Sequence, residues 1–95
     1  MTNEQTQDVR DIQQAIDLSF QVEAFLKSPV GQYLIKRCED KIAEALELLK
    51  TVSPENPTQI RALQHNIHVG EDIQYFLAEA IQAGYNAAEN FTKEQ

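Results

Sequence analysis

Apolar residues in the C-terminal part of the chain recur every three or four positions, which is the spacing of one face of an α-helix. The longer of two such rows, the main stripe, runs through Ile60, Leu63, Ile67, Gly70, Gln74, Leu77, Ile81, Gly84, Ala88 and Phe91. A second stripe lies beside it and consists of Val69, Ile73, Phe76, Ala80, Ala83 and Ala87. Two adjacent stripes predict a long helix, over residues 57–92, that contacts more than one neighbouring helix.

Two earlier segments also show helical spacing. Residues 29–51 carry a row formed by Ile35, Cys38, Ile42, Ala45 and Leu49, which continues to Val52 and which Leu34, Leu46 and Leu48 widen. Residues 8–27 have a less regular apolar face, on which Phe20, Phe25 and Leu26 are expected to be buried. Between the helices lie Ser28-Pro29 and Asn56-Pro57, each a capping side chain followed by a proline, which suits the first helical position.

These features predict an all-α fold with three helices, over about 8–27, 29–51 and 57–92. We expect a single helical domain over residues 1–95, with frayed ends at 1–7 and 93–95. Short connections favour an antiparallel hairpin or bundle, in which the long third helix pairs with the second and the first packs across one side.

The third helix is longer than its expected partner. At 1.5 Å per residue it measures ~54 Å, against ~35 Å for the second helix. About a third of the main stripe therefore needs cover from the first helix or from another subunit, which favours a homo-oligomer or a subunit of a larger complex. The interface candidates are Ile67, Gly70, Gln74, Leu77, Ile81, Gly84, Ala88 and Phe91.

Three main-stripe positions are unusual for a buried helix face. Gly70 and Gly84 each cost about 1 kcal/mol relative to alanine inside a helix. Close approach of another backbone explains both, and a bend at Gly70 is the alternative. Gln74 either fixes the register of a helix pairing or reaches solvent or a backbone partner at the edge of the stripe, and the sequence leaves both interpretations open.

The candidate chemistry is sparse. His65 and His68 are followed by Glu71 and Asp72, but both histidines fall opposite the main stripe, so a solvated face with a local ion pair is expected rather than a metal site. Cys38 is expected to be a buried, apolar thiol. No catalytic triad order, phosphate-binding loop or CxxC motif occurs, which argues against an enzyme and against a bound cofactor. Tyr33, Tyr75 and Tyr85 are amphipathic, and Tyr75 and Tyr85 are expected to project partly outward.

The net charge of −7 disfavours direct binding to nucleic acid or to an anionic membrane surface, because both need clustered lysine and arginine. A hydrophobic content of 42% is that of a globular protein rather than a disordered one. The polar N-terminal residues do not form a signal peptide, and no apolar run is long enough to span a bilayer. We therefore expect a cytoplasmic protein.

Four segments carry a resemblance to a known group of proteins. They are Phe25-Leu26-x-Ser28-Pro29-x-Gly31-x-Tyr33-Leu34, Val52-Ser53-Pro54-Glu55-Asn56-Pro57, Ile60-x-x-Leu63-Gln64 and Phe76-Leu77-x-Glu79-Ala80-Ile81-x-x-Gly84. With them, the stretch from Phe25 to Phe91 resembles small uncharacterised helical proteins of tailed bacteriophages and prophages, which are often encoded near head-assembly genes. The resemblance implies a phage origin, a place in the host cytoplasm or the virion, and a role by protein–protein contact, and it transfers no catalytic residue.

The function expected from these observations is that of a non-enzymatic interaction or assembly protein, in the manner of a phage structural component. The alternative is an acidic, phage-encoded inhibitor that mimics DNA and occupies a nucleic-acid site on a host protein. The scattered distribution of the acidic residues speaks against the alternative, since a DNA mimic needs carboxylates in rows at phosphate-like spacing.

Overall fold

The computed structural model describes the backbone of residues 3–93 and the side chains of residues 8–92. It consists of three helices, α1 (Asn3–Lys27), α2 (Pro29–Leu49) and α3 (Pro57–Lys93), and it has no strand within the described range. The predicted all-α fold is therefore confirmed. Helix α1 begins at Asn3, earlier than expected, while α2 ends at Leu49, two residues before the expected end. The expected fraying of residues 1–2 and 94–95 lies outside the described residues.

The corner between α1 and α2 is built around Ser28. Its hydroxyl accepts a hydrogen bond of 3.0 Å from the amide of Gly31 and donates one to the carbonyl of Phe25, so a single side chain joins the end of α1 to the start of α2. Pro29 follows at a position where its missing N–H is not needed. A Cβ atom on Gly31 would collide with the Phe25 carbonyl oxygen, so the corner requires glycine at this position.

The loop between α2 and α3 uses the second capping signal. The side-chain oxygen of Asn56 accepts a hydrogen bond of 3.2 Å from the amide of Gln59, and Pro57 opens α3. At the end of α2, the amides of Thr51 and Val52 both bond to the Leu48 carbonyl, at 3.2 and 3.1 Å, and close the last turn early. This tightened turn ends α2 at Leu49.

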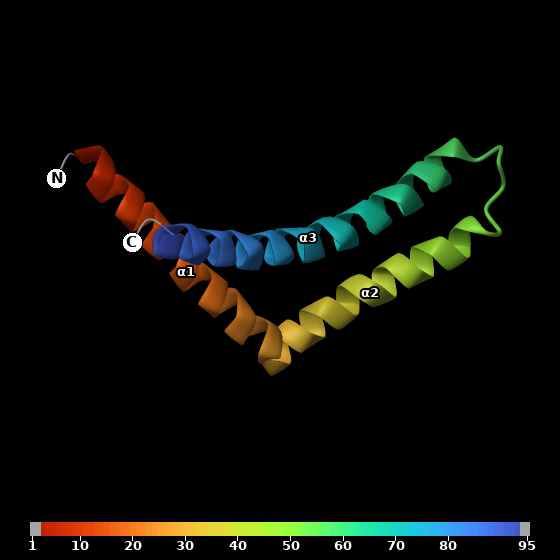
Figure 1. Cartoon of the computed structure of the whole chain (residues 1–95). Helices are drawn as coiled ribbons and strands as arrows, with labels where there is room; N and C mark the ends of the chain where they lie inside the picture. Colours follow the sequence, from red (N-terminus) through yellow and green to blue (C-terminus); the bar gives the residue numbers. More distant parts are fainter. Residues whose placement is uncertain (1–2, 94–95) are drawn as a thin grey trace.

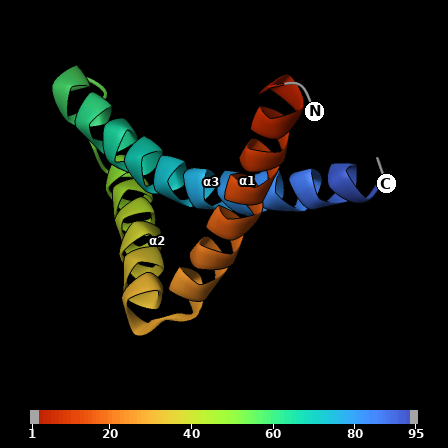
Figure 2. The same cartoon turned by 90° about the vertical axis from the view of Figure 1, so that its left-hand side faces the viewer.

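Helices α1 and α2 form a V whose corner lies at residues 27–29, and α3 spans from one arm to the other (Figure 1). Helix α2 lies along the N-terminal half of α3, and α1 crosses its C-terminal half at a steep angle (Figure 2). The long helix therefore contacts both other helices, as the two stripes predicted. Helix α1 also covers the part of α3 that α2 does not reach, so the length mismatch does not by itself require another subunit.

The core is thin. Among the described residues, the buried apolar side chains are Cys38, Ala45 and Leu63, and Ser19 is the buried polar one. Ile67, Leu77 and Ile81 are half-buried rather than core. The expectation that Phe20 is buried is wrong, because its side chain is 64% exposed. It directly follows Ser19, the residue that faces α3, and successive side chains on a helix point about 100° apart.

The molecule is elongated and flat, with extents of 63 × 29 × 19 Å. Its radius of gyration is 19.2 Å, whereas a compact domain of this length has about 12 Å. A flat layer of three helices has too little interior to enclose the apolar faces of all three.

Candidate interaction surface

The crossing of α1 and α3 is centred on Gly84. A Cβ atom on this residue would collide with Cβ and Oγ of Ser19, and the carbonyl oxygen of Ala15 would lie 3.0 Å from it. The Ser19 hydroxyl is already used within α1, where it donates a hydrogen bond of 2.7 Å to the Ile16 carbonyl. The expected close approach of another backbone at Gly84 is therefore confirmed, and the approaching helix belongs to the same chain.

A hydrogen bond marks one side of this crossing. The hydroxyl of Tyr85 on α3 donates to Oε1 of Glu23 on α1 at 2.7 Å. This bond to the carboxylate, followed by the negative charge of Glu23, raises the pKa of Tyr85 above its ordinary value of 10.0. The bond joins α1 to α3 at the surface of the protein. The Tyr85 side chain is otherwise largely exposed, as expected.

Helices α2 and α3 meet at Gly70. A Cβ atom here would lie 2.8 Å from Cγ1 and 3.0 Å from Cδ1 of Ile42, and 3.1 Å from the carbonyl oxygen of Cys38. The closest contacts are thus with a side chain that can rotate, and the backbone carbonyl lies at nearly the same distance as at Gly84. Close packing accounts for Gly70 as well. The Cys38 thiol is free and buried, as expected.

Gln74 lies between these two crossings. Its side chain is half-buried, and Nε2 is buried without a hydrogen-bond partner. A buried donor of this kind typically costs 1–3 kcal/mol. In this structure Nε2 of Gln74 reaches neither solvent nor a backbone partner. The interpretation in which the Gln74 amide finds such a partner at the edge of the stripe is therefore wrong for this atom.

The main stripe, from which the interface candidates came, therefore faces the inside of the chain over much of its length. Gly70 and Gly84 are buried against α2 and α1, and neither is free to contact another molecule. Ile67, Gln74, Leu77, Ile81 and Ala88 are half-buried, and Phe91 is 37% exposed.

The open apolar surface lies elsewhere and is extensive for so small a chain. Large hydrophobic side chains are exposed on all three helices: Val9, Leu18 and Phe20 on α1, Val30, Tyr33, Leu46 and Leu48 on α2, and Tyr75, Phe76, Tyr85 and Phe91 on α3. On the second stripe, Phe76 is 63% exposed and Ala83 is exposed as well. The rings of Tyr75 and Phe76 pack edge to face, with 6.2 Å between their centroids.

One part of this surface is almost free of charge. Residues 73–88 of α3 contain one charged residue, Glu79, although Asp, Glu, Lys and Arg together make up 24% of the chain. Charged residues are depleted at the centres of protein interfaces, and aromatic residues are enriched there. The outward side of this segment therefore has the composition of an interface.

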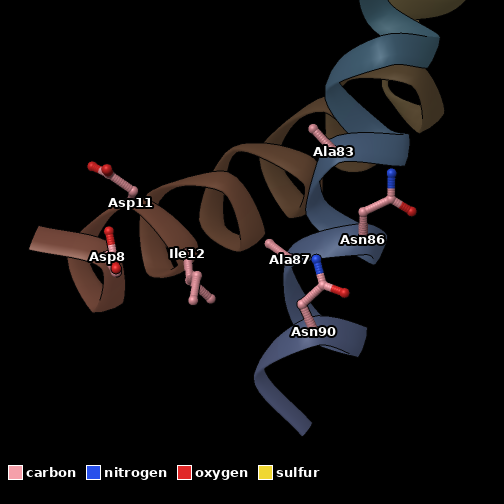
Figure 3. A pocket seen from close by; sticks show the side chains of 7 residues that line it. All are labelled: Asp8, Asp11, Ile12, Ala83, Asn86, Ala87 and Asn90. Carbon is pink, nitrogen blue, oxygen red and sulfur yellow. The ribbon is translucent and has the colours of Figure 1, made fainter. Parts of the chain in front are cut away.

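Two adjoining hollows lie along the same segment. The first, of about 540 Å³, opens where α1 and α3 diverge beyond their crossing (Figure 3), and it is lined by Asp8, Asp11, Ile12, Ala83, Asn86, Ala87 and Asn90. The second, of about 390 Å³, continues along α3 and is lined by Tyr75, Ala78, Glu79, Gln82, Ala83 and Asn86. Ala83 and Asn86 line both hollows, so the two form one shallow, open depression.

The polar candidates are dispersed. His65 and His68 are both exposed, as expected, and no ion pair joins His68 to Asp72, both of which the structure describes. Within residues 3–93, no three histidine, cysteine, aspartate or glutamate side chains converge as a metal site would require. Two exposed lysines pair with acids at 3.0 Å, Lys36 with Asp40 and Lys50 with Glu47, and such surface pairs stabilise a fold only weakly.

None of the helices, over the residues that the structure describes, is both long and apolar enough to cross a membrane. No protein-family model, curated protein or solved structure matches the chain.

Two functional features of the crossings were not anticipated from the sequence. Ala15 and Ser19 are small residues spaced four apart, and this spacing is a signal that a neighbouring backbone comes close on that side of α1. The second feature is Gly31 at the corner between α1 and α2, the glycine against which a backbone atom lies closest. Its position three residues after a capping serine is the available signal.

Proposed function

We propose that this protein acts by protein–protein contact, as a non-enzymatic assembly or interaction subunit that forms a homo-oligomer or joins a larger complex. The observation that carries the proposal is the amount of surface left open. The chain exposes 7341 Å², whereas a folded monomer of 10.8 kDa exposes about 5,500 Å².

The chemistry of that surface supports the proposal. Eleven large hydrophobic side chains are exposed among the described residues, while three apolar side chains are buried. A second polypeptide that covers part of this surface would supply the apolar burial that the thin core lacks.

The resemblance to phage-encoded helical proteins directs the proposal to a setting. A structural or assembly component of a phage particle works in the host cytoplasm or within the virion. The same surface would then be covered in the assembled particle and open in the newly made chain.

The test is to isolate the protein from its native source at its natural level and to identify the proteins that accompany it in fixed stoichiometry. In parallel, light scattering gives the mass of the purified chain as a function of concentration. We expect either a stoichiometric partner or a mass of at least twice 10.8 kDa, the mass of one chain. A monomer at every concentration that has no stoichiometric partner would contradict the proposal.

The identity of a partner also separates the proposal from its alternative. If the partner is a nucleic-acid-binding protein that loses its nucleic acid when this chain binds, the acidic inhibitor replaces the assembly subunit. A partner that belongs to a particle or scaffold supports the proposed function.

A further inference from the structure

We propose that two copies of this chain associate through the second stripe of α3, around a two-fold axis, with their α3 helices antiparallel. The inference rests on the proposed function and deepens it, because it names the partner as a second copy and the central contact as Phe76 against Ala83.

The exposed area of the chain is large enough for a partner of substantial size. The chain exposes 7341 Å², roughly 1,800 Å² more than a monomeric protein of its mass. A standard interface buries about 800 Å² on each partner, and obligate dimers bury more than about 1,000 Å² on each. The excess is therefore enough for one obligate dimer interface.

The distribution of charge selects the second stripe for contact between two copies. Each chain carries a net charge of −7, so two copies repel each other over most of their surface. Residues 73–88 hold a single charge, Glu79. Two identical acidic chains approach each other with least repulsion through this segment, and the exposed ring of Phe76 lies in it.

The stripe is complementary to itself, which a two-fold interface requires. Phe76 and Ala83 are both exposed and lie seven residues apart, so they share one side of α3 two turns from each other. An axis midway between them passes between Glu79 and Ala80. It places Phe76 of each copy against Ala83 of the partner subunit, so that a large side chain meets a small one twice.

The hollow beside Ala83 provides space for the incoming ring. In Figure 3, Ala87 projects from α3 toward α1, and both Ala83 and Ala87 line this hollow with small side chains.

The arrangement has one unfavourable feature, and it gives the inference a signature. Glu79 lies beside the axis and so beside Glu79 of the partner subunit. Because this contact is between like charges, salt should strengthen the dimer by screening it. A foreign partner with a basic surface would instead bind more weakly as salt rises.

The first experiment measures the dimer dissociation constant by sedimentation or light scattering. We expect a wild-type dimer of twice 10.8 kDa. Phe76→Ala should raise its dissociation constant at least about tenfold, as for a central aromatic anchor. The matched control is Phe20→Ala, since Phe20 is 64% and Phe76 is 63% exposed, and it should leave the constant unchanged. Glu79→Gln should lower the constant several-fold at low salt and reduce the salt dependence.

The second experiment tests the axis with single cysteines in a Cys38→Ala background. Glu79→Cys should form a disulfide-linked dimer on oxidation, because the residue meets its own copy. Asn86→Cys, exposed on the same helix, should not, since the two copies of this residue lie about 20 Å apart along the direction of the α3 helices. Helical circular dichroism before oxidation shows that each variant is folded.

A mass of 10.8 kDa at all concentrations would overturn the inference, as would a dimer that dissociates with Phe20→Ala and not with Phe76→Ala. Crosslinking through Asn86→Cys but not Glu79→Cys would overturn the assigned register. A monomeric chain that still holds another protein in fixed stoichiometry would overturn this inference alone and leave the proposed function standing. A monomeric chain without such a partner would overturn both.

Discussion

Gly84 of α3 and Ser19 of α1 meet where the two helices cross, and the Ser19 side chain fills the space that a Cβ atom of residue 84 would take. The contact sets the distance between the helices, because the nearest atoms of Ser19 are its Cβ and its internally bonded hydroxyl. With Ala15 on the same side of α1, the contact makes this crossing a backbone-to-backbone approach.

Gly84→Ala should therefore destabilise the protein despite the better helix propensity of alanine. Propensity favours alanine by about 1 kcal/mol, while overpacking typically costs 1–3 kcal/mol. Because the obstructing atoms belong to or adjoin the α1 backbone, α1 must move outward, and packing should outweigh propensity. The measurement is the urea midpoint or the melting temperature, which should fall.

Gly70→Ala is the matched comparison and should cost less. Its added methyl group meets the Ile42 side chain, which can change rotamer. If Gly84→Ala instead raised the melting temperature while the mass stayed the same, α1 would not cross α3 at that position.

The corner between α1 and α2 should depend on the hydroxyl of Ser28. Ser28→Ala removes both the acceptor for the Gly31 amide and the donor to Phe25, and loss of such a cap costs about 0.5–2 kcal/mol. Ser28→Thr, which keeps the hydroxyl, is the control and should lose less. Chemical denaturation of both variants measures the difference. Equal losses for alanine and threonine would mean that the hydroxyl does not hold the corner.

Burial ranks the apolar positions of α3 by their contribution to stability. Leu63 is 7% exposed, so Leu63→Ala should lower the free energy of unfolding by about 2–4 kcal/mol through lost burial and a cavity. Leu77 is half-buried, and Leu77→Ala should cost less. Exposed His65 and His68 should each tolerate alanine within about 0.5 kcal/mol. Urea titrations of the four variants test this order, and a histidine variant that cost more than Leu77→Ala would contradict the placement of the helix faces.

The bond between Tyr85 and Glu23 should make stability depend on pH in the alkaline range. The folded protein raises the pKa of Tyr85 above 10.0 because the hydroxyl donates to Glu23. The bond therefore contributes fully below pH 10, and the contribution is lost as the pH rises through the folded pKa. Tyr85→Phe should remove this part of the pH dependence.

Absorbance of tyrosinate measures the pKa directly in a Tyr33→Phe and Tyr75→Phe background, where Tyr85 is the remaining tyrosine. The titration midpoint should fall when Glu23→Ala removes the acceptor. A midpoint that did not change would show that the bond does not persist in solution.

Much of the local structure follows from the sequence alone, because its causes are local. The spacing of apolar residues from Ile60 to Phe91 predicts a helix. Ser28-Pro29 and Asn56-Pro57 mark the residues at which α2 and α3 begin. Two stripes on α3 also predicted two neighbours, and both α1 and α2 contact it. The exposure of His68 and Tyr75 and the burial of Cys38 follow from the same periodicity.

The tertiary structure decided what each stripe packs against. The length of α3 predicted that part of the main stripe needs cover from the first helix or from another subunit, and in the structure α1 crosses it at Gly84 and covers it within the chain. Periodicity gives the face of a residue on its own helix, whereas the angle at which a second helix crosses depends on small residues in both helices, such as Ser19 and Gly84. The sequence by itself therefore determined the helices and their faces, while the corner at Ser28 and the steep crossing of α1 decided that Phe20 and Phe76 remain exposed.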